Sequence, residues 1–281
     1  MTTIVTDSSV DLPPAEAERL GVVIAPLSVA FADEVLHDEG LSREEFYRRL
    51  EQAPRTPLVS GASADAFVEA LEKIKQRGDD QVVALVMSVG SSFTYVAMEV
   101  AVRRVTGLQY SIVNTGRSLA AQAALTIAAA EAAQAGVARE AIVRLVEELS
   151  GSSDTYLVPA GLDYLRRSEQ LTTLSQGPAG RLDGAVPVVR VRGKLTAMAK
   201  APDAEAARDQ MLDRVAQAID PQREQIAVVT HAVAPEAAAR VAEKLAQRIN
   251  CRTPLITELG PTVGTYLGPG TVGVGYCPVP A

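Results

Sequence analysis

Short aliphatic and β-branched runs alternate along this chain with longer segments of helical periodicity. The clearest apolar run, residues 81–87, has no polar alternation and is typical of a strand covered on both faces. Another strand-like run, residues 226–229, lies between helical patterns at 203–219 and 235–249. This alternation indicates strands joined by crossover helices. We therefore expect an α/β fold with mostly parallel or mixed sheets flanked by helices.

A length of 281 residues favours two domains over one. The small polar stretch 151–154 interrupts the pattern near the midpoint of the chain and predicts the boundary. We expect an N-terminal α/β domain at residues 1–152 and a C-terminal α/β domain at residues 153–281.

Local signals place several elements inside these halves. Residues 42–45, Ser-Arg-Glu-Glu, form a capping box in which Ser42 bonds a first-turn amide and Glu45 reaches back. A second helix is predicted to start at Ser63 and to bury an apolar face at i, i+4, i+7 spacing, made of Phe67, Leu71 and Ile74.

Glycines mark the expected breaks later in the chain. Two helices, 118–135 and 138–149, are separated at Gly136, and a hairpin is predicted around Gly193. The glycine-rich tail, residues 255–276, is interpreted as strand.

Composition and charge exclude several classes of protein. Hydrophobic residues make up 47% and charged residues 22%, which is too apolar for a disordered chain. The net charge of -7 argues against nucleic acid as a main partner. The sequence lacks an apolar run of about 18 residues, so no transmembrane segment is expected. The amino terminus has no basic region before an apolar stretch, so we expect a cytoplasmic protein.

The chain has two histidines and two cysteines, and no CxxC or HxxxH motif. A metal site is therefore not expected. The sequence also lacks the G-x-S-x-G elbow of hydrolases, the phosphate-binding GxxxxGK[ST] loop and the GxGxxG dinucleotide fingerprint. No cofactor is expected.

Four stretches follow predicted strands or resemble turns where ligand sites form: residues 6–13, 59–63, 88–95 and 264–270. Each can be explained as a helix cap or a tight turn. The third also offers several hydroxyls at a strand-to-helix transition, a pattern that suits an anion.

Other polar residues favour structural roles. His231 ends a predicted strand and is interpreted as a hydrogen-bonded structural residue rather than a base. His37 lies in an acidic stretch and is expected to be solvated. A small cluster of basic residues is interpreted as a solvated face or as a docking patch for an acidic partner. It comprises Arg166, Arg167, Arg190, Arg192 and Lys194.

Taken together and in this order, the stretches resemble the DegV family of fatty-acid-binding proteins, which includes the FakB subunits of bacterial fatty acid kinase. The resemblance covers residues 3–280 as a single unit. It rests on Thr6-Asp7-Ser8-Ser9, Val59-Ser60-Gly61-Ala62-Ser63, Ser92-Phe93-Thr94-Tyr95, Asn114-Thr115, Leu162-Asp163-Tyr164-Leu165, His231-Ala232 and the segment 264–270.

The resemblance implies a long-chain fatty acid in a tunnel between the two α/β domains, with its carboxylate held by hydroxyl groups. The family's serine falls on Ser92. Its threonine falls on Val59, which leaves Ser60 as the nearest hydroxyl, and its histidine falls on Tyr266. Weaker candidates for ligand contacts are Asp7, Ser8, Val59, Thr94, His231 and Gly264.

We therefore expect a lipid-binding protein without catalytic activity, with a role in lipid transport or fatty acid metabolism and an acid such as palmitate as ligand. The resemblance also suggests a partner, a dihydroxyacetone-kinase-like fatty acid kinase subunit that receives the carboxylate, and transient membrane contact. Two alternatives remain: an enzyme that uses the interdomain cleft for phosphoryl or acyl chemistry on a small polar substrate, and a family member that has lost lipid binding and acts as an interaction protein. Convergent carboxylates in the cleft would favour the enzyme, and an aliphatic lining the lipid.

Overall fold

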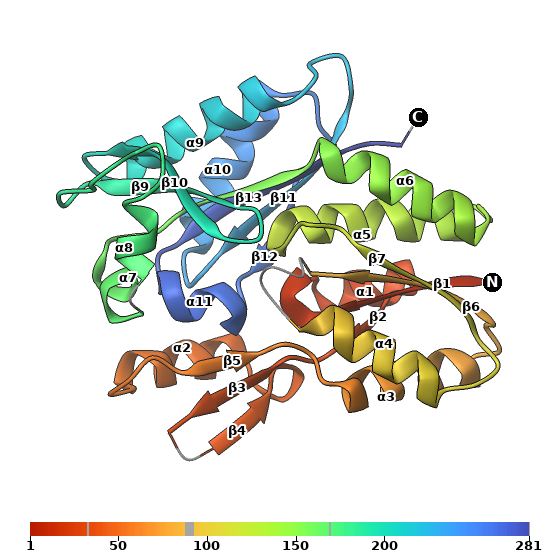
Figure 1. The fold of residues 1–281 in the computed structure, drawn as a ribbon. Helices are drawn as coiled ribbons and strands as arrows, with labels where there is room; N and C mark the ends of the chain where they lie inside the picture. Colours follow the sequence, from red (N-terminus) through yellow and green to blue (C-terminus); the bar gives the residue numbers. More distant parts are fainter. Residues whose placement is uncertain (33, 88–92, 169, 281) are drawn as a thin grey trace.

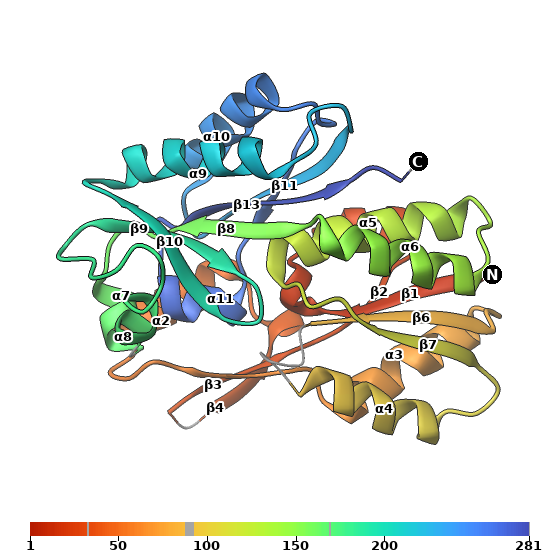
Figure 2. The same ribbon diagram turned by 45° about the horizontal axis from the view of Figure 1, so that its top comes forward.

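The computed structural model describes residues 1–32, 34–87, 93–168 and 170–280. In these residues the chain forms a four-stranded, a six-stranded and a three-stranded sheet. Figures 1 and 2 place α9 and α10 (Ala204–Ala218 and Pro235–Arg248) against the six-stranded sheet. In the same views α5 and α6 (Leu119–Gln134 and Arg139–Gly151) lie between the two larger sheets. This confirms the expected α/β class.

The four-stranded sheet is entirely parallel and has the order β2-β1-β6-β7. Its strands are β1 (Thr2–Asp7), β2 (Val23–Ala25), β6 (Gln81–Val86) and β7 (Gln109–Asn114). The helices that join them are α1 (Pro14–Leu20), α3 (Ala64–Gln76) and α4 (Thr94–Arg104). Strand β6 is almost wholly buried, as its unbroken apolar run predicts.

The six-stranded sheet is mixed and has the order β10-β9-β8-β13-β11-β12. Only β11 and β12 pair in parallel within it. Its strands are β8 (Asp154–Val158), β9 (Val186–Val191), β10 (Leu195–Ala201), β11 (Gln225–His231), β12 (Leu255–Glu258) and β13 (Val272–Pro278). The hairpin predicted around Gly193 is β9–β10.

The three-stranded sheet is antiparallel and has the order β4-β3-β5. It consists of β3 (Ser28–Phe31), β4 (Glu34–His37) and β5 (Leu58–Ser60). A 3-10 turn (Asp38–Gly40) and α2 (Arg43–Gln52) connect the last two strands. The buried aromatic side chains of α2 pack with residues of α11 (Pro261–Leu267). Residues of α7 (Asp163–Arg167) and α8 (Gln170–Leu174) belong to the same buried cluster.

Helix α5 joins the two larger sheets into one core. Its flanking turn contains Gly136 in the left-handed region, where the break between the two helices was predicted. Its apolar side chains pack with Ile4 and Leu85 of the parallel sheet and with Val228 and Cys277 of the mixed sheet. The division of the chain at residue 152 remains a prediction, since this core includes residues from both sides of it.

The predicted caps are confirmed in part. The Ser42 hydroxyl accepts a hydrogen bond from the Glu45 amide at 3.1 Å, and the Ser63 hydroxyl accepts from the Ala66 amide at 3.1 Å. Glu45 does not complete the capping box, because its carboxylate instead accepts hydrogen bonds from Arg48 and Arg49. The face of α3 predicted from Phe67, Leu71 and Ile74 is fully buried.

The interpretation of the tail as continuous strand is wrong between β12 and β13, where the chain forms α11. Pro261 occupies the first turn, where no amide hydrogen is needed, and the Thr265 hydroxyl donates to the Pro261 carbonyl at 2.7 Å. The glycine spacing that suggested a turn instead allows close packing. A Cβ atom on Gly264 would lie 2.5 Å from the Tyr47 hydroxyl, and Gly268 ends the helix with φ +73°.

We expect Gly275→Ala to destabilise the fold strongly. A Cβ atom at this position of β13 would overlap the backbone of Ala120 and Ala121 in α5, which cannot move without displacing the helix. Overpacking of this kind lowers the free energy of unfolding by about 1–3 kcal/mol or more. Gly151→Ala is the control, because nothing lies within 4 Å of the added atom and the residue has ordinary helical geometry. Denaturant unfolding should separate the two variants, and an unfolding midpoint of Gly275→Ala equal to that of Gly151→Ala would contradict this packing.

Candidate functional site

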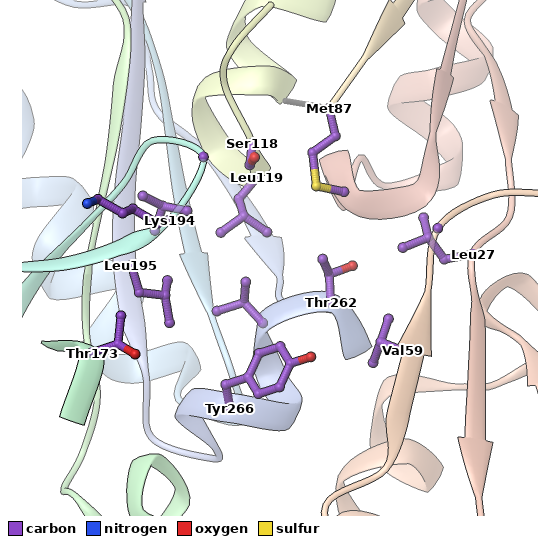
Figure 3. Close-up of a pocket in the computed structure, with 14 residues that line it drawn as sticks. Leu27, Val59, Met87, Ser118, Leu119, Thr173, Lys194, Leu195, Thr262 and Tyr266 are labelled. Atoms are coloured by element: carbon purple, nitrogen blue, oxygen red, sulfur yellow. The ribbon is translucent and has the colours of Figure 1, made fainter. Parts of the chain in front are cut away.

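A cavity of about 320 Å³ lies where the three sheets approach one another (Figure 3). Its volume is at the small end of the range typical of ligand pockets, about 300–1,000 Å³. Among the described residues its wall is formed by Leu27, Val59, Gly61, Met87, Ser118, Leu119, Thr173, Val191, Gly193, Lys194, Leu195, Thr262, Val263 and Tyr266.

Each wall of the cavity comes from a different part of the chain. Val59 belongs to β5 of the three-stranded sheet, and Leu27 immediately precedes β3. Met87 follows the buried strand β6. Ser118 and Leu119 begin α5, and the β9–β10 hairpin supplies the wall around Lys194. The cavity therefore depends on contacts between segments that are distant in sequence.

Another wall is supplied by α11, a helix that sequence reasoning missed. Thr262, Val263 and Tyr266 lie on one helical face because they are spaced at i, i+1 and i+4. Pro261 at the first helical turn and Gly268 just past the last were available signals for this helix.

Aliphatic side chains dominate the lining, and no Asp, Glu or His appears among the described residues that form it. The polar groups are hydroxyls and one ammonium group, contributed by Ser118, Thr173, Thr262, Tyr266 and Lys194. Burial raises the pKa of the Tyr266 phenol above 10, so this group stays a neutral donor at physiological pH. The arrangement can hold an apolar chain and donate hydrogen bonds to an oxygen.

Within the described part of the chain, no three acidic, histidine or cysteine side chains are placed to hold a metal ion. The same part contains no helix with the length and hydropathy needed to cross a bilayer.

A family model described as "Uncharacterised protein, DegV family" matches residues 1–279. The chain belongs to the DegV family. A DegV domain-containing protein of Streptomyces coelicolor is 32% identical over 286 residues, which cover 96% of each chain. Another, of Halalkalibacterium halodurans, is 27% identical over 275 residues, or 97% of each chain.

Solved structures share the whole fold. A DegV family protein from Thermus thermophilus, described by its fatty acid binding, aligns with a TM-score of 0.87 at 24% identity over 99% of both chains. DegV of Bacillus subtilis, described as a fatty acid binding protein, aligns at 0.85 and 24% identity over 98% of both. A stearic acid-binding protein from Eubacterium ventriosum aligns at 0.85 and 20% identity, covering 99% of this chain and 98% of that one. At these identities the likeness shows the fold.

Two of the candidate ligand residues suggested by the DegV resemblance, Val59 and Tyr266, lie in the cavity wall. Ser60 is exposed and is not among the lining residues, because successive side chains of a strand such as β5 point to opposite faces. Ser92 lies outside the described residues. The roles of Ser92, Ser60 and Tyr266 as carboxylate ligands remain predictions.

The weaker DegV candidates, Val59 apart, have structural positions outside the cavity lining. The Ser8 hydroxyl accepts a hydrogen bond from the Leu27 amide at 3.0 Å, and the Asp7 carboxylate accepts from the Ser9 amide at 3.0 Å. The imidazole Nδ1 of His231 accepts from the Ala234 amide at 3.3 Å, which agrees with the structural interpretation of this histidine. Thr94 is buried in the first turn of α4, and Gly264 packs on Tyr47 from α11.

A buried cluster of charges fastens the cavity wall α11 to the amino-terminal part of the DegV fold. The Asp11 carboxylate accepts hydrogen bonds from the Gly260 amide at 2.9 Å and from the Arg43 guanidinium at 3.1 Å. Arg43 also pairs with Asp38, and the Tyr47 hydroxyl donates to the Leu259 carbonyl at 2.8 Å. Since Gly260 caps α11, Asp11 holds the helix from a position 249 residues away.

Burial outweighs the neighbouring cation at Asp11 and raises the pKa of its carboxyl to about 7. Asp38 and Asp7 add to this rise, while Arg43 and the Gly260 amide oppose it. The folded protein therefore binds a proton on Asp11 at pH values where the unfolded chain has released it.

The contribution of Asp11 to the free energy of unfolding should be complete below about pH 4 and lost as pH rises to about 7. Asp11→Asn keeps an acceptor for the Gly260 amide but removes this titration. We expect the free energy of unfolding to fall more steeply between pH 4 and 7 in the wild type than in Asp11→Asn, by up to about 4 kcal/mol. Asp163→Asn, which changes an exposed carboxylate, should keep the wild-type slope. Chemical denaturation at several pH values measures this dependence. If the free energy of unfolding changes equally with pH in all three proteins, Asp11 is ionised throughout this range.

Proposed function

We propose that this protein binds a long-chain fatty acid in the cavity between its three sheets. The observation that carries the proposal is the aliphatic lining, which has hydroxyl donors and no carboxylate among its described residues. An anionic head group would be repelled by an acidic pocket and is compatible with this one. Solved proteins of the same fold that are described as fatty acid binding support the assignment.

The energetics suit an acyl chain. Burial of about 15 methylene groups at about 0.8 kcal/mol each stabilises the complex by roughly 12 kcal/mol before the cost of association is subtracted. The tail therefore supplies most of the affinity, and the head-group contacts set its orientation. Tyr266 is our candidate donor to the carboxylate, with Ser92 and Ser60 as the further hydroxyls suggested by the family motifs.

The role is that of a carrier rather than of an enzyme. Convergent carboxylates would favour phosphoryl or acyl chemistry on a small polar substrate, and the described lining contains none. The protein holds the acid and presents its carboxylate to a dihydroxyacetone-kinase-like subunit. We place this exchange in the cytoplasm. Because a long-chain acid partitions into bilayers, we also expect transient membrane contact.

Protein purified from a bacterial host should carry fatty acid, because the burial of the tail makes dissociation slow. Organic extraction followed by mass spectrometry should find near-stoichiometric acid of about 14–18 carbons, given the methylene count above. If no such acid is found, and none binds after deliberate loading of the purified protein, the proposed function is wrong.

Tyr266→Phe should weaken acid binding by about 1.5–3 kcal/mol, the usual contribution of a hydrogen bond to a charged group. The raised pKa keeps the phenol protonated between pH 5 and 8, whereas a histidine would change charge in that window. Binding by the wild type should therefore vary less from pH 5.5 to 8.0 than binding by Tyr266→His. Titrations with a fluorescent fatty acid at three pH values test both points, and wild-type affinity of Tyr266→Phe at every pH would remove Tyr266 from the head-group site.

A further inference from the structure

One of the polar side chains that line the cavity, Ser118, has a hydroxyl that makes no hydrogen bond with any of the described residues. Ser118 is 3% exposed and lines the cavity. In the described part of the protein its oxygen has no hydrogen-bond partner. A buried hydroxyl without a partner is unusual, since most buried polar groups in proteins are paired.

The reason the Ser118 hydroxyl is unpaired lies in strand β8. Ser118 occupies the N-cap of α5, where a serine hydroxyl ordinarily accepts a hydrogen bond from an amide of the first turn. Here the Ala121 amide donates to the Thr155 hydroxyl at 2.8 Å, and that hydroxyl donates to the Ser118 carbonyl at 2.9 Å. Thr155 thus performs the capping role, and the Ser118 hydroxyl stays without a partner among the described residues, in the wall of the cavity.

The surroundings of Ser118 favour a ligand oxygen. The amino terminus of the 16-residue helix α5 carries a partial positive charge, and the Lys194 side chain also lines the cavity. Leu119 adopts φ +58°, a region that leucine rarely occupies, and its side chain forms the neighbouring apolar wall. The cavity therefore offers a hydrogen-bonding group beside a lipophilic surface.

Figure 3 shows Ser118 and Tyr266 on different sides of the cavity. A plain hydrocarbon tail anchored at Tyr266 would pack methylene groups against the unpaired Ser118 hydroxyl, which is unfavourable. We propose, building on the proposed function, that the ligand is an acyl chain with a second oxygen function, which Ser118 binds. The shared chemistry is an oxygen that accepts a hydrogen bond, whether it belongs to a hydroxyl, a keto group or a second carboxylate.

Competition with a fluorescent fatty acid on delipidated protein tests this proposal. The panel contains hexadecanoic acid, its mid-chain hydroxy and keto positional isomers, and hexadecanedioic acid. For the wild type, we expect at least one oxygenated acid to bind about tenfold more tightly than hexadecanoic acid, as one hydrogen bond would give. The positional isomer that binds most tightly indicates how far along the acyl chain Ser118 lies. The class of acid that binds most tightly, hydroxy, keto or dicarboxylic, identifies the oxygen function.

Ser118→Ala should abolish that preference and should raise the affinity for hexadecanoic acid, because methylene groups would no longer pack against an unpaired hydroxyl. Its thermal midpoint without ligand should equal or exceed that of the wild type, because an unpaired buried hydroxyl has been removed. Ser150→Ala is the matched control, since it removes a buried serine hydroxyl in α6 that is bonded to the Val146 carbonyl, and it should keep the preference.

Three results would overturn the inference, and they can be distinguished. If the wild type binds hexadecanoic acid and every oxygenated acid binds no more tightly, or if Ser118→Ala retains the preference, the second anchor is wrong and the fatty acid function stands. If the wild type binds no acid of the panel, the proposed function and this inference fall together.

Discussion

The packing of α5 directly against backbone is the constraint on which the two larger sheets depend. Nearly every residue of this helix is buried, and most of them are alanines. Small side chains on the helix and Gly275 on β13 bring helix and strand backbones closer than ordinary side chains permit. Because the same helix also covers β1, the relative placement of the sheets follows from its diameter and direction. The position of the cavity depends on this placement, because the amino terminus of α5 forms part of the cavity wall.

Periodicity in the sequence was sufficient for elements whose determinants are local. The unbroken run of β6, the cap at Ser63 and the break at Gly136 each depend on residues within a few positions, and the structure confirms them. Helix α11 was missed although Pro261 and Gly268 mark its ends, and its amino terminus is held by Asp11, which belongs to the other end of the chain. No pattern within the tail can report that contact, and the glycines there were interpreted as signs of turns.

The candidate site shows the same division between local and distant determinants. Motif position was enough to direct attention to Val59 and Tyr266, which lie in the cavity wall. The neighbouring Ser60 has the right chemistry, but strand alternation turns it away from the lining. Ser118 could not be recognised from sequence, since a serine before a helix predicts an N-cap. Only the position of Thr155 on β8 shows that the capping role is filled by another residue.

The contact between Asp11 and Gly260 also governs when a binding site can exist during synthesis. Its partners are separated by 249 residues, so the contact adds to the contact order of the fold and closes one of the longest loops in the chain. Translation delivers β1 and the buried acid first, whereas the helix that the acid holds is made near the end, before β13 alone. A nascent chain on the ribosome therefore lacks one wall of the cavity until almost all of its residues have emerged, and the cavity is complete only in the finished protein.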